Sequence, residues 1–202
     1  MWELDHLAVT CADLAEGAAH VERALGLPLL PGGQHARFGT HNRLLGLGPG
    51  LYLEVIAPDP AAPPPGLPRW FALDHARTPR LANWIARTDD LARALTLSPE
   101  DAGEPVALSR GDLAWSIAVP PDGDIPQRGG WPTLIQWTAG THPATRLPDS
   151  GARLVRLEVY HPDAAALAAR LPLSDPRVSY VTATFPRLRA AIATPQGERW
   201  LA

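Results

Sequence analysis

One order of elements constrains the fold of this chain more than any other feature: a strand, a helix and further strands, which occur twice in succession. The first helix is bounded by Asp13, which fits an N-cap, and by Gly26, which ends it. Alternating or apolar segments predict the strands of this first unit at residues 4–10, 39–47 and 51–57. Pro31-Gly32-Gly33 is predicted to be a turn. The order of strand, helix and further strands favours a βαβββ unit, of which these segments supply three of the four strands.

A proline-rich connector separates the first unit from the second. Residues 58–68 contain six prolines, which predicts a stiff segment outside any core element. The pattern then restarts, with a short helix that opens at Asp90. The strands of the second unit are predicted at residues 81–87, 104–108, 113–119 and 133–138. We therefore predict an α+β protein built from paired βαβββ units.

A shorter third cycle follows and is predicted to be a βαββ extension with a structural role. Its strand, helix and two further strands are predicted at residues 152–160, 163–171, 178–184 and 188–193. The chain is thus expected to comprise first unit, connector, second unit and extension, at residues 1–57, 58–80, 81–143 and 144–202. A chain of 202 residues is short enough for all four segments to form one domain.

Charge and composition argue against several classes of partner. The net charge of −3 disfavours nucleic acid, which usually requires a basic face. No apolar run approaches the ~18–20 residues of a membrane span, and the first residues do not resemble a signal peptide, so we expect a cytoplasmic protein without a membrane partner. All 18 basic residues are arginine, which excludes a Schiff-base lysine. The single cysteine, Cys11, is predicted to be a buried, inert thiol.

His6 and Glu54 are the strongest candidates for a joint functional site. Residues two apart in a strand share a face, so Leu4, His6 and Ala8 are predicted to lie on one face of the first strand. Glu54 interrupts an apolar strand, where a charged carboxylate is costly to bury without a partner. His6 can provide that partner, through a shared metal or a direct hydrogen bond. The alternative is a solvent-facing Glu54 beside an incidental histidine.

Five short motifs, spread over both units, carry a family resemblance. In the first unit they are Leu4-Asp5-His6-Leu7-Ala8-Val9, Gly39-Thr40-His41-Asn42-Arg43-Leu44-Leu45 and Tyr52-Leu53-Glu54-Val55-Ile56-Ala57-Pro58. In the second unit they are Leu134-Ile135-Gln136-Trp137 and His142-Pro143. Together they resemble the glyoxalase-like domain family of the vicinal oxygen chelate superfamily. The resemblance implies that the paired units curl into a cup-like mixed sheet around a divalent metal.

The resemblance also implies metal ligands from the first and last strands of each unit. His6 and Glu54 occupy those positions in the first unit. Superposing the units places Asn83 over His6 and Gln136 over Glu54, so the second pair departs from the superfamily pattern. We therefore expect a weak site formed by His6, Glu54 and Gln136, which would suit Mn²⁺, Mg²⁺ or Ni²⁺ better than tightly bound Zn²⁺.

Further residues are expected to bind substrate in the cup. His35, His41 and Asn42 lie on or beside a strand that the resemblance places along the cup wall. Asn83, which corresponds to His6 in the second unit, is also expected to contact the substrate. The tryptophans of the second unit's strands, by contrast, are interpreted as core packing; they are Trp84, Trp115 and Trp137.

The activity implied by the resemblance is that of a metal-dependent lyase or isomerase acting on a small oxygenated molecule. Glu54 and His6 would be its catalytic residues, with Glu54 shuttling a proton or binding the metal and His6 binding the metal. The alternative is a metal-free protein that binds a small molecule or an antibiotic, which the amides of Asn83 and Gln136 favour. A third interpretation is a vestigial site in a fold that serves an oligomer. Members of this superfamily often pair, so a homodimer is expected.

Overall fold

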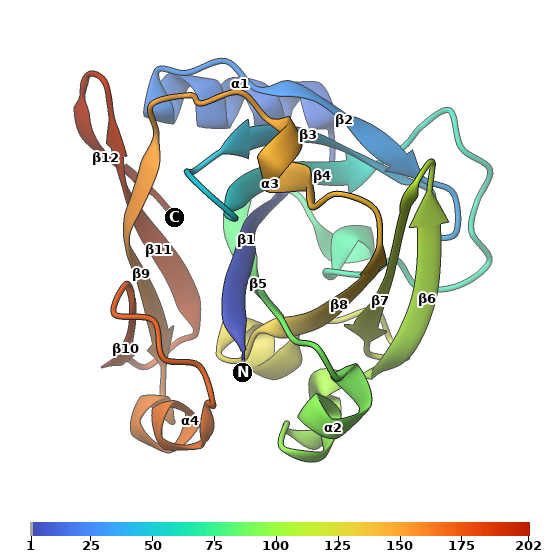
Figure 1. Ribbon diagram of the computed structural model, residues 1–202, viewed down its shortest axis with the longest axis vertical. Helices are drawn as coiled ribbons and strands as arrows, with labels where there is room; N and C mark the ends of the chain where they lie inside the picture. The colour runs from blue at the N-terminus through green and yellow to red at the C-terminus, as the bar shows by residue number, and fades with distance from the viewer. Residues whose placement is uncertain (1) are drawn as a thin grey trace.

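The computed structural model describes residues 2–202, which form two β-sheets (Figure 1). The larger sheet has eight strands in the order β2-β3-β4-β1-β5-β8-β7-β6, and the smaller has four in the order β10-β9-β11-β12. The larger sheet curls until its two edge strands, β2 and β6, approach one another (Figure 1). The predicted α+β class and cup-like mixed sheet are confirmed.

The first unit supplies one half of the curled sheet. Its elements are β1 (Glu3–Thr10), α1 (Leu14–Leu25), β2 (Leu30–His35), β3 (Thr40–Gly46) and β4 (Tyr52–Pro58). Asp13 caps α1 by accepting a hydrogen bond from the backbone N–H of Glu16, and Gly26 ends the helix with a φ of 69°. Both predicted helix boundaries are therefore confirmed.

The second unit supplies the other half. Its elements are β5 (Arg80–Arg87), α2 (Leu91–Thr96), β6 (Glu104–Arg110), β7 (Leu113–Val119) and β8 (Thr133–Ala139). Short 3-10 turns lie before β5, at Leu73–His75, and between later elements of this unit, at Glu100–Ala102 and Pro126–Gly129. The halves join where β1 pairs antiparallel with β5. Within each half the first strand also pairs parallel with the last, which is the equivalence expected of two related units.

The small sheet of the C-terminal extension packs against the convex face of the curled sheet, whereas Ala144, near the start of the extension, packs with Leu44 and Tyr52 on the concave face. Its elements are α3 (Pro143–Arg146), β9 (Arg153–His161), α4 (Ala164–Arg170), β10 (Val178–Thr182), β11 (Arg187–Thr194) and β12 (Gly197–Leu201). Leu157 and Leu188 of the small sheet share a buried core with Leu7 and Val55 of the large one. The strand β12 is additional to the predicted βαββ order. None of the helices in residues 2–202 is long and apolar enough to cross a membrane.

A turn was expected at Pro31-Gly32-Gly33, but these residues belong to the edge strand β2. Leu30 pairs with Leu44 of β3, and the register then shifts between Pro31 and Gln34, as at a β-bulge. Proline is compatible with an edge strand because its missing N–H costs no ladder hydrogen bond there. The two glycines occupy the irregular part of the strand, where the side chain of Asn42 lies too close for a Cβ at Gly32.

A register shift in β1 changes which residues face the cup. Leu4 pairs with Ala86 and His6 with Ile85, so Asp5 is the extra residue of a bulge. Leu4 consequently packs in the convex core with Leu7, and not with His6 as strict alternation predicts. The bulge places the side chains of Asp5 and His6, adjacent in sequence, within hydrogen-bond distance of each other.

Candidate functional site

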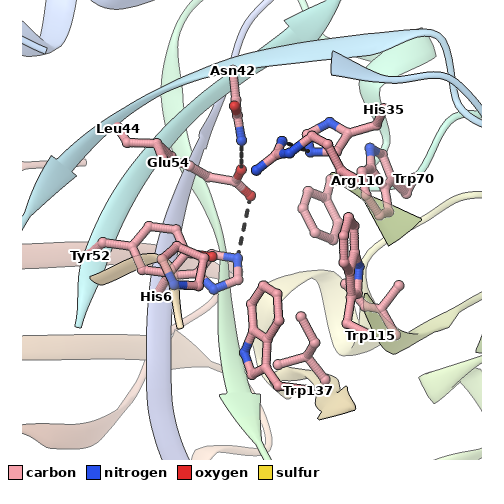
Figure 2. A pocket seen from close by; sticks show the side chains of 14 residues that line it. His6, His35, Asn42, Leu44, Tyr52, Glu54, Trp70, Arg110, Trp115 and Trp137 are labelled. Carbon is pink, nitrogen blue, oxygen red and sulfur yellow. Dashed lines mark hydrogen bonds and ion pairs between the residues drawn. The ribbon is translucent and has the colours of Figure 1, made fainter. Parts of the chain in front are cut away.

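A pocket opens on the concave face of the curled sheet, between side chains of both units (Figure 2). Its apolar walls are formed by Leu44, Tyr52, Trp70, Phe71, Trp115, Ile117, Ile135, Trp137 and Pro143. Its polar groups are His6, His35, Asn42, Glu54 and Arg110. Mostly apolar walls with a few convergent polar groups are typical of a site for a small molecule.

Glu54 is the polar centre of this pocket, and each of its carboxylate oxygens has a partner. Oε1 lies 3.4 Å from Nε2 of His6, and Oε2 accepts a hydrogen bond of 2.8 Å from Nδ2 of Asn42 (Figure 2). The backbone N–H of Gly33 donates to Oδ1 of Asn42 at 2.8 Å. Because that N–H can only donate, the amide of Asn42 must turn its NH₂ group toward Glu54. The predicted pair His6 and Glu54 is thus brought together, with Asn42 beside it.

Asp5 extends this chain of contacts on the other side of His6. Its Oδ1 lies 2.6 Å from Nδ1 of His6. Its Oδ2 accepts a hydrogen bond of 3.0 Å from Nε1 of Trp137 and lies 2.9 Å from Nε2 of His142. Asp5 has no exposed surface. The imidazole of His6 is therefore held between two buried carboxylates, those of Asp5 and Glu54.

This arrangement sets the charges of the site. Burial opposes the charge of His6, but its contacts with Asp5 and Glu54 prevail and raise its pKa from 6.5 to about 9. Burial likewise opposes the charge of Glu54, but His6 and Asn42 hold the pKa of that carboxyl below its ordinary value. At neutral pH the pocket thus contains an imidazolium beside an ionised carboxylate. The ring of Tyr52 stacks on His6 with centroids 4.4 Å apart and keeps it in place.

His35 and Arg110 join the two edges of the curled sheet at the pocket. Nε2 of His35, at the end of β2, lies 3.1 Å from a guanidinium nitrogen of Arg110, at the end of β6. Nδ1 of His35 lies 3.1 Å from the hydroxyl of Thr40, which also accepts a hydrogen bond from the indole of Trp70. Burial lowers the pKa of His35 to about 4, and the charge of Arg110 adds to this effect. His35 is therefore a neutral acceptor, and Arg110 retains its full charge.

Gln136 does not reach the pocket, although it was predicted to bind a metal. Its Nε2 donates to the backbone oxygen of Asp89, and its Oε1 accepts from the backbone N–H of Leu91, at the start of α2. The pocket is lined instead by its two neighbours, Ile135 and Trp137. Adjacent residues of a strand point to opposite faces, so Gln136 must lie on the outer face.

Asn83 and His41 also lie outside the pocket lining. Asn83 is fully buried, and its amide donates to the hydroxyl of Thr133 at 2.9 Å. His41 is adjacent to Asn42 on β3 and so points to the opposite face, where its Nδ1 lies 4.0 Å from a carboxylate oxygen of Asp59. Of the predicted substrate-binding residues, the structure brings Asn42 and His35 to Glu54's pocket and leaves Asn83 and His41 away from it.

Several residues of the pocket and its support were not identified from the sequence. Asp5 stands beside His6 in the first motif, but nothing in the sequence marks the bulge that turns both side chains inward. Trp115 and Trp137, interpreted as core packing, form a wall of the pocket. Arg110 ends a polar, half-exposed strand and carries no motif. His142 belongs to the motif His142-Pro143, but nothing in the sequence indicates that it contacts Asp5.

The side chains around Glu54 fit a metal poorly. A Zn²⁺ site usually has three or four protein ligands, and within residues 2–202 no three His, Cys, Asp or Glu side chains gather in a way that could bind one. Only His6 and Glu54 of the predicted ligands face the pocket. The nearest other charged group in the pocket lining is the cation of Arg110. This donor set favours chemistry carried by the protein's own side chains.

A family model and the solved structure of a protein from Staphylococcus aureus agree with this architecture. A family model described as a glyoxalase-like domain matches residues 4–173. The solved structure of a hypothetical protein from Staphylococcus aureus superposes with a TM-score of 0.62 and 14% identity, covering 93% of this chain and 88% of that chain. A methylmalonyl-CoA epimerase from Mycobacterium tuberculosis gives a TM-score of 0.43 and 20% identity, covering 70% of this chain and 91% of that chain. Among curated proteins, none matches this chain.

Proposed function

This chain belongs to the glyoxalase-like domain family, and from that premise we propose that it binds a small oxygenated molecule and moves a proton on it. The observation that carries the proposal is the contact between Glu54 and His6, whose Oε1 and Nε2 atoms lie 3.4 Å apart in the pocket. The apolar walls favour a small organic molecule, and the charged pair provides both a base and a hydrogen-bond donor.

The charges of the pair suggest how the step proceeds. Glu54 accepts a proton from a carbon beside a carbonyl group, and the electron pair of that C–H bond moves onto the carbonyl oxygen as an enolate. Once Glu54 is neutral, the Nε2–H of His6 is free to donate to the enolate oxygen. The positive charge of His6 thereby pairs first with the carboxylate and then with the enolate. Return of the proton from Glu54 to a carbon of the enolate gives an isomerised product.

The test is proton exchange between small molecules and solvent. We expect the wild-type protein in D₂O to catalyse exchange of the activated C–H of at least one member of a panel of 2-hydroxy ketones, 2-oxo acids and thioesters, followed by NMR. Glu54→Gln should slow that exchange by about 10²-fold, because the amide is no base. Arg43→Met, on the opposite face of the same sheet, should leave it unchanged. Exchange that survives in Glu54→Gln would refute the role of Glu54.

A second candidate function is metal-free binding of a small molecule without catalysis. It is favoured by the aromatic wall, since Trp70, Trp115 and Trp137 can stack on a flat ligand without any reaction. A ligand that raises the melting temperature in the presence of chelator, yet exchanges no proton in D₂O, would support binding over the isomerase proposal.

A metal-dependent lyase or isomerase, the activity expected from the resemblance, makes a different prediction. We expect protein purified without chelator to contain well below one equivalent of Mn, Mg, Ni or Zn, because only two of the three predicted ligands, His6 and Glu54, face the pocket. Metal analysis by mass spectrometry checks this, with His6→Ala as the control. One equivalent of metal in the wild type that is lost in His6→Ala would establish the metal-dependent form.

A further inference from the structure

Arg110 is a cation in the pocket that the protein itself does not neutralise. It is half-buried at the end of β6 and lines the same pocket as Glu54. Within residues 2–202, no carboxylate oxygen lies within 4.0 Å of its guanidinium, whereas most other arginines that contact a partner have an acidic one. Among residues 2–202, the hydrogen-bond partner of Arg110 is Nε2 of His35, at 3.1 Å. Four of its five N–H donors therefore remain for a ligand.

The contact with His35 positions Arg110 without reducing its charge. A guanidinium cannot accept a hydrogen bond, so Nε2 of His35 must be the acceptor and Nδ1 must hold the ring proton. That proton is then donated to the hydroxyl of Thr40, 3.1 Å away. The imidazole is fixed as a neutral acceptor, and it orients one N–H of Arg110 while the remaining donors stay free.

Gly33 provides the space in which the guanidinium lies. A Cβ placed on Gly33 would lie 2.4 Å from Nη1 and 2.6 Å from Cζ of Arg110, far inside normal contact distances. The edge strand β2 therefore has a glycine at the point where the side chain of Arg110, from β6, reaches it. The space left by this glycine lets the guanidinium lie at the junction of the two edges, in the lining of the pocket.

From these contacts we propose that Arg110 is an anion subsite and that the pocket binds a small molecule bearing a carboxylate. A guanidinium with free parallel N–H donors recognises a carboxylate in a bidentate manner. A singly charged carboxylate fits better than a phosphate dianion, because the ionised Glu54 shares the pocket and repels excess negative charge. The tryptophan walls favour a flat apolar body attached to that carboxylate. This inference rests on the proposed function, since it names the ligand class for the same pocket.

The test compares carboxylates with their uncharged amides in matched pairs: benzoate and benzamide, nicotinate and nicotinamide, and salicylate and salicylamide. Dissociation constants are measured by calorimetry on the full chain, with Arg110→Met as the main variant. We expect at least one carboxylate to bind the wild type more tightly than its amide, and Arg110→Met to weaken that carboxylate about 10- to 100-fold while changing the amide little. Arg43→Met removes an exposed arginine of β3 and is the matched control for net charge.

A second variant keeps the positive charge and moves it. Gly33→Ala should displace the guanidinium and weaken the same carboxylate, although the net charge is unchanged. The proposal is overturned if no carboxylate binds the wild type better than its amide, or if Arg110→Met and Arg43→Met weaken binding equally. Proton exchange in D₂O is measured separately, so loss of carboxylate preference refutes the anion subsite, and exchange independent of Glu54 refutes the catalytic proposal.

Discussion

Replacing Asp5 by alanine should lower the free energy of unfolding by about 3–5 kcal/mol, because the change leaves a buried cation without its closer counter-ion. Asp5 is completely buried and has three hydrogen-bond partners, which are Nδ1 of His6, Nε2 of His142 and Nε1 of Trp137. A guanidinium nitrogen of Arg87 also lies 3.7 Å from its carboxylate. Alanine leaves all three hydrogen-bond partners without an acceptor, and His6 loses the carboxylate at 2.6 Å. Urea denaturation of the wild type and the variant at pH 7 measures the difference.

Two further variants separate the charge of Asp5 from its shape. Asp5→Asn preserves the volume but replaces one acceptor oxygen with a donor, so we expect a loss smaller than that of alanine and still large. Asp112→Ala also removes a carboxylate paired with an arginine, Arg146, but on the exposed surface, and it should change stability little. If Asp5→Ala is no more damaging than Asp112→Ala, the contacts of Asp5 do not stabilise the fold as argued.

The order of elements was predictable because each element carries its own local signal. Asp13 and Gly26 bound α1 through the conformations that they favour, and these do not depend on the rest of the fold. The strands β2 and β12 lacked such a signal. Pro31-Gly32-Gly33 has the composition of a turn, and Glu198 and Arg199 break the apolar alternation of β12. Both strands exist because a neighbouring strand supplies their hydrogen bonds, which is information that the local sequence does not hold.

The candidate site was predictable only for residues at which two signals agree: a charged group in an apolar strand, and strand parity, which is the alternation of side chains between the two faces of a strand. Glu54 stands out because a charged residue inside an apolar strand requires a partner, and strand parity places His6 on the same face. Parity failed for Asp5, which the bulge in β1 turns toward His6. Strand parity also places Gln136 outside the pocket, because its two apolar neighbours face the pocket and adjacent residues of a strand face opposite sides. The prediction of Gln136 as a ligand rested on its polarity and on the superposition of the two units. Superposing two units by spacing fixes which strands correspond, but an error of one residue reverses the face.

The stability of this protein should reach its maximum near pH 6.5 and fall by about 3 kcal/mol as the pH rises to about 9. In the unfolded chain His6 loses its proton near its ordinary pKa of 6.5, whereas in the folded chain it retains the proton up to about 9. Between these values only the folded state binds that proton. The stabilisation is fully present below pH 6.5 and is lost as the pH rises through the folded pKa.

His35 produces the opposite slope on the acid side of this maximum. Its pKa is about 4 in the folded chain and 6.5 when unfolded, so below pH 6.5 the unfolded state binds a proton that the folded state excludes. Stability should therefore fall by a comparable amount between pH 6.5 and about 4, and further acid should protonate Asp5 and Glu54, whose folded pKa values are lowered. Urea midpoints measured from pH 4 to pH 9 test both limbs. His6→Gln should flatten the alkaline limb and His35→Gln the acid limb, and a profile that neither variant alters would show that these two imidazoles do not set the pH dependence.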